Sequence, residues 1–159
     1  MRDELKSSAQ KVQEALHRRG LTCEVVQMQA TTRTAEDAAR AVGCEVGQIV
    51  KSLVFESKQS RRPILVVASG ANRVNEKTLA QQISEPVKMA NAEFVREMTG
   101  FAIGGVPPLG HRHPLTIFID EDLLNYEEIW AAAGTPHAVV KLTPDELKMI
   151  TNGKVICVK

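Results

Sequence analysis

The amino-acid sequence predicts an α/β (α+β) fold, with a mixed central β-sheet of about seven strands surrounded by helices. Short apolar runs rich in β-branched residues alternate along the chain with segments in which apolar residues recur at helical spacing. The chain has 159 residues, 43% of them apolar, and a chain of this length buries roughly two thirds of its unfolded surface. We therefore expect residues 1–159 to form a single domain that needs neither a disulfide nor a metal for stability.

In the first half of the chain, each expected element has a start or an end signal. Apolar residues recur at helical spacing before Gly20, and Thr34 followed by Glu36 and Asp37 is typical of a capped helix start. Gly43 is typical of a helix end. The expected elements are a helix ending at Gly20, a strand over 24–27, a helix from 34 to about 41, and strands over 48–56 and 63–69.

In the second half, polar capping residues precede each expected helix. Asn75, Asn91 and Asn125 are such residues, and Thr143 with Glu146 forms a capping box. The expected helices run from 75 to about 82, from 91 to near Gly100, from 125 to 133 and from 143 to 152, and the expected strands cover 86–90, 115–119, 138–142 and 155–158. Residues 101–113 contain three glycines and two prolines, which predicts a loop with a specially shaped backbone.

Composition restricts the class of partner. Twenty basic residues against 19 acidic ones give a net charge of +1, and aromatic residues make up only 4% of the chain. A protein coated with positive charge is excluded, and an aromatic platform for stacking single-stranded bases has little material to be built from. The charge is unevenly distributed, because residues 57–75 and 98–119 contain no acid whereas residues 120–128 contain no base. We expect any RNA contact to be small and sensitive to salt.

The cysteines and the N-terminal residues indicate the compartment. Cys23, Cys44 and Cys157 form no Cys-x-x-Cys pair, which is typical of a reduced interior. The first residues are charged and contain no continuous apolar stretch, so we expect no signal peptide, no membrane span and a cytoplasmic location. His111, His113 and His137 with Asp120 lack the spacing of a metal-binding set, and we expect no metal.

Lys51 is the first candidate for chemistry. In a strand, its side chain shares one face with the apolar side chains of Ile49, Leu53 and Phe55. An unpaired ammonium is costly to bury. Lys51 is therefore expected to reach solvent at an edge, to pair with a carboxylate, or to face a cleft in which an anion or a polarised substrate binds.

The segment Gly104-Gly-Val-Pro-Pro108 is the second candidate. Adjacent glycines let backbone amides approach a ligand closely, and the two prolines hold the backbone that follows. Rigid amides directed at one point stabilise an oxyanion, and a plain tight turn is the alternative. His137 follows a Gly-Thr-Pro loop at the start of a strand, where it either faces a cleft or is a structural histidine.

Four segments of the chain together resemble the YbaK/EbsC family. This family comprises trans-editing aminoacyl-tRNA deacylases related to the insertion (editing) domain of bacterial prolyl-tRNA synthetase. The segments are TAEDAARAVGCEVGQIVKSLVF (34–55), VVASGANRVNEKTL (66–79), TGFAIGGVPPLGH (99–111) and IFIDEDL (117–123). They occur in the family's order. The resemblance implies the editing-domain fold and hydrolysis of the 3′-ester of a mischarged tRNA, such as tRNA for proline carrying alanine, cysteine, serine or 2-aminobutyrate.

The resemblance also implies roles for individual residues. Lys51 matches the family's essential lysine, and Gly104 with Pro108 matches its Gly-x-x-x-Pro motif. Ser52 occupies a position that varies among subfamilies, and His137 falls near a substrate-sensing histidine of some members. Neither a metal nor another cofactor is implied. The expected partners are the acceptor end of a mischarged tRNA and an aminoacyl-tRNA synthetase.

Combined with the physical argument, the resemblance gives a hypothesis for the site. Gly104 and Gly105 donate backbone amides to the substrate carbonyl or to the attacking water, and Lys51 binds a phosphate, the ribose or the developing negative charge. Two prolines fix the loop, and four side chains form the pocket walls. The prolines are Pro107 and Pro108, and the walls are Phe101, Ile103, Val106 and Ser52.

Two other classes of function remain open at this level. In one, Lys51 forms a Schiff base with a carbonyl substrate. In the other, the protein is a module that binds tRNA or a synthetase without catalysis. The sequence does not identify the tRNA, the amino acid, the base that activates the nucleophile, or the oligomeric state.

Overall fold

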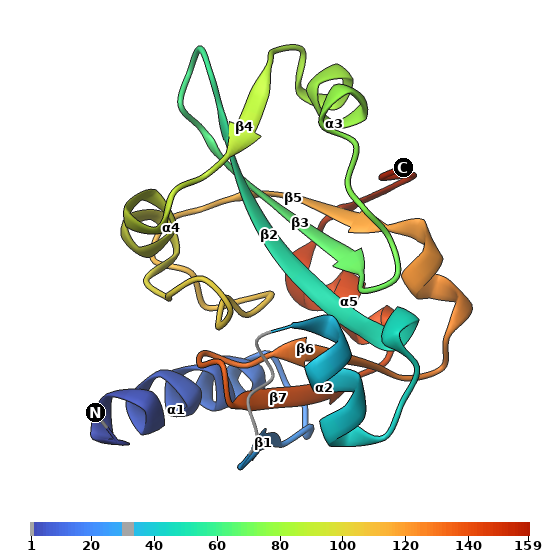
Figure 1. The fold of residues 1–159 in the computed structure, drawn as a ribbon. Coiled ribbons are helices and arrows are strands. Elements are labelled where there is room, and N and C mark those ends of the chain that lie inside the picture. The colour runs from blue at the N-terminus through green and yellow to red at the C-terminus, as the bar shows by residue number, and fades with distance from the viewer. Residues whose placement is uncertain (1, 30–33) are drawn as a thin grey trace.

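The centre of the computed structural model, which describes residues 2–29 and 34–159, is a mixed sheet of eight strands within that part of the chain (Figure 1). Along the sheet the order is β1-β7-β6-β2-β3-β5-β8, and β4 also pairs with β2. The strands are β1 (Val25–Gln27), β2 (Ile49–Ser57), β3 (Pro63–Ser69), β4 (Val87–Met89), β5 (Thr116–Asp120), β6 (Ile129–Ala132), β7 (Ala138–Leu142) and β8 (Lys154–Ile156). The expected α+β class with a mixed sheet is confirmed.

Local sequence signals place the helices as expected. Thr34 and Asn91 accept hydrogen bonds from first-turn amides of their helices, and Thr143 and Glu146 form a reciprocal capping box. The α-helices are α1 (Arg2–Arg18), α2 (Ala35–Val42), α3 (Glu76–Ile83), α4 (Ala92–Thr99) and α5 (Pro144–Thr151), and two 3₁₀ helices are η1 (Val46–Gln48) and η2 (Glu121–Asn125). Most observed boundaries lie within about two residues of the expected ones.

One expected element is wrong. The helix predicted from Asn125 to Ala133 is replaced by the end of η2 and by β6. In β6, burial alternates with a period of two, because Ile129 and Ala131 are buried while Trp130 and Ala132 are half-buried. This strand pairs in parallel with β2 and antiparallel with β7. Pairing with the neighbouring β7 and with the sequence-distant β2 overrides the helix propensity of the alanines here.

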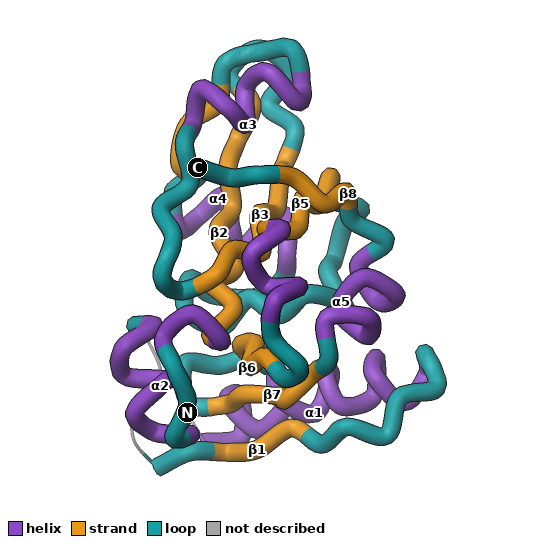
Figure 2. The backbone as a smooth tube through the Cα atoms, turned by 90° about the vertical axis from the view of Figure 1, so that its right-hand side faces the viewer, coloured by secondary structure: helices purple, strands orange, loops and turns teal. Residues whose placement is uncertain are grey.

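The helices cover different parts of the sheet. Val12 and Leu16 of α1 pack into the largest buried cluster, together with Val50 and Val54 of β2. Leu79 of α3 packs on the other side with Phe55, and α2 covers Ile49 near one end of β2. Figures 1 and 2 show α3 and β4 at one end of the molecule and α1 at the opposite end, with β2 running between them. Among the residues described here, no helix has both the length and the apolar composition needed to cross a membrane.

The two edges of β2 differ. β3 pairs with it continuously, from Val50 to Glu56. On its other edge, β6 reaches only Ile49 and Val50, whereas β4 pairs only with Phe55–Ser57. The middle of β2 therefore has a strand neighbour on one side only within the described part of the chain, and this opening positions the candidate site.

Candidate functional site

A cavity of about 390 Å³ lies beside the middle of β2. Its volume is within the range of sites that bind small ligands. Segments far apart in the sequence form its walls: the start of α2, β2, the turn after β3, the loop after α4, and β6 with β7. The lining residues are Thr34, Ala35, Glu36, Ala38, residues 49–53, Gly70, Ile103, Gly104, Val106, residues 130–132 and Val139. Lys51 and Gly104, which are separated by about fifty residues of sequence, thus border one space.

Lys51 is half-buried at this cavity, and its ammonium donates a hydrogen bond to the backbone carbonyl of Asn72. The Asn72 side chain is itself held, because its amide donates to Asp120 at 2.8 Å and to Asp122 at 2.7 Å. No carboxylate of the described residues forms an ion pair with Lys51. An ammonium has three N–H donors, so Lys51 is oriented by Asn72 and keeps donors for a ligand.

The carboxylate of Asp120 holds Asn72, the hydrogen-bond partner of Lys51, in place. Asp120 is fully buried, and its oxygens accept hydrogen bonds from the Ser69 and Asp122 amides at 3.0 and 2.9 Å as well as from Asn72. Asp122 also pairs with Lys159 at 3.2 Å, and hydrogen bonds from Asn72 and then Lys159 lower the pKa of Asp122. This network fixes the turn that follows β3, and with it the acceptor of Lys51.

The two adjacent glycines of the loop have different roles. Gly104 adopts a φ of 90°, a left-handed conformation that favours glycine. Its N–H has no acceptor among the described residues. The N–H of Gly105 instead donates to the carbonyl of Ala102 at 3.0 Å, which closes a turn. This revises the expected role of Gly105, because its amide already has a partner within the loop.

Gly105 has a packing role. Its carbonyl accepts from the N–H of Gly134 at 2.9 Å, and a Cβ on Gly105 would lie 2.9 Å from backbone atoms of Gly134 and Thr135. Gly134 in turn packs closely against the backbone of Ser8 in α1. The loop is therefore held by direct backbone contact with the β6–β7 turn, which a side chain at position 105 would prevent.

The rest of the loop is anchored away from the cavity. Phe101 is 4% exposed and belongs to the largest buried cluster, and its amide donates to Thr99 Oγ1 at 3.0 Å. Pro107 and Pro108 are buried, and His111 Nε2 hydrogen-bonds to the carbonyl of Pro107 at 2.6 Å. Burial lowers the pKa of His111, and the Pro107 contact opposes this shift. In the described part of the chain, neither Phe101, nor the two prolines, nor His111 lines the cavity.

The expected site residues therefore separate into two groups. The cavity brings together Lys51, Ser52, Ile103, Gly104 and Val106. His137 is half-buried at the turn between β6 and β7, and its backbone bonds to Thr135 Oγ1 and to Met28. Within the described residues, His137 does not line the cavity.

Ser52 is distinguished by its hydroxyl. Its Oγ is buried and has no hydrogen-bond partner among the described residues. Ser52 also lines a second, smaller cavity of about 50 Å³ that has Ile103 and Val106 in common with the larger one. The rest of its lining is apolar: Leu53, Val54, Met89, Ala90 and Val95.

Two parts of the cavity wall were not predicted from the sequence, namely Trp130 and the start of α2. Trp130, the single tryptophan, borders the larger cavity from β6. The Lys141 ammonium lies 5.9 Å from the centre of the Trp130 ring and pairs with Glu128 at 2.8 Å. The wrong helix prediction for 125–133 concealed Trp130, whereas the uniqueness of this aromatic residue was a usable signal. The start of α2 was predicted only as a capped helix start, and nothing in its sequence indicated that it lines a cavity.

The histidines and Asp120 do not assemble into a metal-binding cluster. Among the residues that the structure describes, no group of three or more His, Cys, Asp or Glu side chains is arranged to hold an ion. His111 contacts Pro107, and Asp120 is occupied by amide donors.

Comparison with known proteins identifies the family. Residues 29–150 match the model of the aminoacyl-tRNA editing domain, and the chain belongs to that family. It is similar to EbsC of Enterococcus faecalis, a candidate Cys-tRNA(Pro)/Cys-tRNA(Cys) deacylase, with 28% identity over 76% of this chain and 74% of EbsC. It also matches a proline–tRNA ligase of Limosilactobacillus fermentum, with 33% identity over 57% of this chain and 16% of the ligase.

A solved structure agrees with this assignment. The fold superimposes with a TM-score of 0.90 on the crystal structure of a candidate trans-editing enzyme for prolyl-tRNA synthetase. The two proteins share 50% sequence identity, and the match covers 96% of each chain. The expected relation to trans-editing proteins and to prolyl-tRNA synthetase is thus confirmed at the level of the family.

Proposed function

We propose that the protein is a trans-editing aminoacyl-tRNA deacylase, which hydrolyses the ester between a wrong amino acid and the 3′ end of a tRNA. One observation carries the proposal: Lys51 and Gly104 border the same cavity in a chain of the aminoacyl-tRNA editing family. An ammonium and a backbone amide are both donors that can stabilise the negative charge that develops in ester hydrolysis.

The proposed substrate is tRNA for proline carrying a small amino acid, namely alanine, cysteine, serine or 2-aminobutyrate. The names of EbsC and of the solved trans-editing relative support tRNA for proline. The cavity of about 50 Å³ supports a small amino acid. One water occupies about 10–15 Å³ on this scale, so this cavity has room for roughly three to five such groups. Discrimination among small residues is then weak, because one methylene changes affinity by only about 1–3 kcal/mol.

The proposed reaction requires positioning more than a strong base. The oxygen of water adds to the ester carbonyl carbon, the bond from that carbon to the ribose 3′-oxygen breaks, and the proton lost by water ends on the ribose oxygen. The N–H of Gly104 donates to the carbonyl oxygen as it becomes negative, and Lys51 binds the ribose or the terminal phosphate. The neighbouring ribose hydroxyl assists the attack.

The test is a panel of mischarged tRNAs incubated with the wild-type protein, with Lys51→Ala and with Lys88→Ala. Lys88 is an exposed lysine on β4 and serves as the matched control. We expect the wild type and Lys88→Ala to release the amino acid from at least one tRNA, and Lys51→Ala to be slower by about a hundredfold or more. Circular dichroism would check that each variant is folded.

Three outcomes would contradict the proposal. If no mischarged tRNA is hydrolysed, the protein is not a deacylase, and retention of tRNA without release would indicate a binding module. If Lys51→Ala keeps full activity, the reaction does not depend on this cavity. If borohydride traps a small carbonyl compound on Lys51, the lysine is a Schiff-base nucleophile.

A further inference from the structure

The middle of β2 has an unpaired edge. β6 pairs with this edge only at Ile49 and Val50, and β4 only at Phe55–Ser57. Residues 51–53 thus have no strand partner on that side in the described part of the chain. Both cavities border this gap, because residues 51–53 line the larger one and residues 52–54 line the smaller one.

Two hydrogen bonds show which backbone groups point into the gap. The carbonyl of Ile49 accepts from the Gly70 amide at 2.7 Å on the β3 side, and the carbonyl of Val54 accepts from the Ala90 amide at 3.0 Å on the β4 side. Successive residues of a strand direct their N–H and C=O groups to opposite edges. Ser52, two residues before Val54, therefore directs its N–H and C=O into the gap.

The side chain of Ser52 adds a third unused polar group. Its Oγ is buried without a partner among the described residues, and Ser52 lines both cavities. Buried polar groups in native proteins are nearly always hydrogen-bonded. Three unpaired groups on one residue, next to Lys51 and across the cavity from the loop of Gly104, indicate a place where a ligand supplies the missing partners.

We propose that this open edge of β2 binds the α-amino group of the aminoacyl ester, with the Ser52 carbonyl as acceptor and Ser52 Oγ as the second acceptor. The inference rests on the proposed function. In an aminoacyl ester, the amine is attached to the carbon next to the ester carbonyl. A group that binds the amine must therefore be close to the group that binds the carbonyl oxygen, and Ser52 lines the same cavity as Gly104.

This contact gives the protein a selectivity that pocket size alone does not give. Acylation of the amine, as in peptidyl-tRNA, removes N–H donors and adds bulk at a strand edge enclosed by Ile103 and Val106. At least one of the two Ser52 acceptors then loses its donor. A deacylase built in this way hydrolyses free aminoacyl esters and leaves a growing peptide on its tRNA.

The first experiment compares hydrolysis of alanyl-tRNA and N-acetylalanyl-tRNA, both prepared on tRNA for proline. We expect the blocked ester to be hydrolysed at least about tenfold more slowly, because its amine no longer serves both acceptors. Equal rates on the two esters would overturn the inference and leave the proposed function intact. No hydrolysis of any mischarged tRNA in the panel would overturn the proposed function itself.

The second experiment measures binding without turnover. The probes are 3′-alanylamino-3′-deoxyadenosine and its 3′-propionylamino analogue, which differs by lacking the amine. Trp130 borders the cavity and is the only tryptophan, so its fluorescence reports occupancy. We expect the alanyl compound to bind at least about tenfold more tightly. Equal affinities would contradict a role of the Ser52 edge in amine binding, whatever the activity of the enzyme.

Two variants separate Ser52 from its neighbours. Ser52→Ala removes the second acceptor but keeps the carbonyl, so we expect it to reduce the preference for the free amine without abolishing it. Glu36 also lines the cavity and is the acid that could bind an amine there. Glu36→Gln is expected to keep the preference. If Glu36→Gln loses the preference while Ser52→Ala keeps it in full, the amine is bound by Glu36 and the inference is wrong.

Discussion

Two serines of the same strand have opposite environments. Ser57, at the end of β2, is fully buried, and its Oγ bonds to Ser60 Oγ at 2.8 Å and accepts from the Arg62 amide at 2.8 Å. Ser52, in the middle of β2, has a buried Oγ without a partner among the described residues. The serine hydroxyl at the end of β2 is therefore hydrogen-bonded, whereas the one beside the cavity has no hydrogen-bond partner among the described residues.

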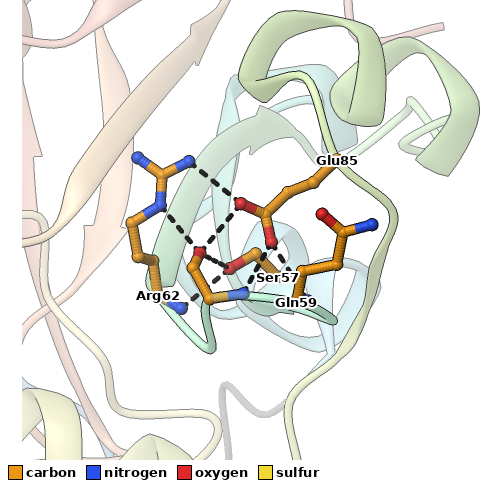
Figure 3. Close-up of polar contacts among 5 residues, drawn as sticks. Ser57, Gln59, Arg62 and Glu85 are labelled. Carbon is orange, nitrogen blue, oxygen red and sulfur yellow. Dashed lines mark hydrogen bonds and ion pairs between the residues drawn. The ribbon is translucent and has the colours of Figure 1, made fainter.

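The turn after β2 extends this contrast (Figure 3). Glu85 lies over the turn and accepts from the amides of Gln59 and Ser60 at 3.1 and 2.9 Å and from Ser60 Oγ at 2.8 Å, and it pairs with Arg62 at 3.4 Å. A saturated network of this kind stabilises one conformation. Unpaired groups beside a cavity stabilise nothing until a ligand arrives, which is why we assign binding to the middle of β2 and a structural role to its end.

The largest expected effect on stability is at Gly105. Alanine there would place a Cβ 2.9 Å from the backbone of Gly134 and Thr135, where no flexible side chain can move aside. We expect Gly105→Ala to lower the free energy of unfolding by about 2–4 kcal/mol, measured by urea denaturation. Unchanged stability would mean that the loop does not depend on this backbone contact.

Gly104→Ala should behave differently from Gly105→Ala. Its φ of 90° makes alanine strained by about 1–2 kcal/mol, which is a smaller loss of stability. Because Gly104 carries the unpaired amide beside the cavity, we expect deacylation to fall further than this loss explains, measured on protein confirmed to be folded at the assay temperature. Full activity of folded Gly104→Ala would remove this amide from the proposed mechanism.

Ser57→Ala tests the saturated end of β2. The substitution leaves the Arg62 amide without its acceptor and removes one of the hydrogen bonds of the Ser60 hydroxyl, so the free energy of unfolding should fall by about 1–3 kcal/mol. Deacylation by the folded variant should be unchanged, because Ser57 lies outside the cavity walls found among the described residues. A loss of activity at full stability would extend the site to this end of the strand.

Ser52→Ala is the matched substitution at the open end. It removes no hydrogen bond among the described residues, so we expect stability to change by less than about 0.5 kcal/mol, while the preference for a free amine declines. Destabilisation as large as that of Ser57→Ala would show that the Ser52 hydroxyl is already satisfied within the protein. That result would contradict our interpretation that Ser57 is structural and Ser52 is available to a ligand.

Acid should weaken the saturated end of the strand. Hydrogen bonds from Ser60 and Gln59 lower the pKa of Glu85 to about 2 from 4.5. A depressed pKa in the folded state contributes stability that is present above the unfolded value and is lost as pH falls from about 4.5 toward 2. In denaturation curves over this range, Glu85→Gln should lose less stability than the wild type, with Glu97→Gln as an exposed control. Parallel curves for all three proteins would contradict this role.

Elements set by residues close together in the sequence were predicted correctly, whereas an element set by long-range strand pairing was not. The caps at Thr34, Asn91 and Thr143 depend on residues within four positions, and the structure has them as expected. The error at Asn125–Ala133 arose because the partners of β6 lie about ten residues later in β7 and about eighty residues earlier in β2. Local helix propensity carries no information about such pairing.

The same distinction applies to the site. Lys51 was predictable because a lysine in an apolar strand is unusual at the level of single residues, and Gly104 because adjacent glycines before two prolines are unusual. The turn that uses the Gly105 amide and the gap at Ser52 depend on the path of the backbone, which composition does not reveal. The resemblance to editing proteins supplied a reason to combine Lys51 and Gly104, and the cavity supplied their common space.

The most direct measurement of the central claim is the single-turnover rate of deacylation for the panel substrate that the wild type hydrolyses fastest. The rate is compared between Lys51→Ala and the surface control Lys88→Ala. We expect Lys88→Ala to match the wild type and folded Lys51→Ala to be slower by about a hundredfold or more. Equal rates for the two variants would contradict the assignment of the reaction to the cavity beside β2.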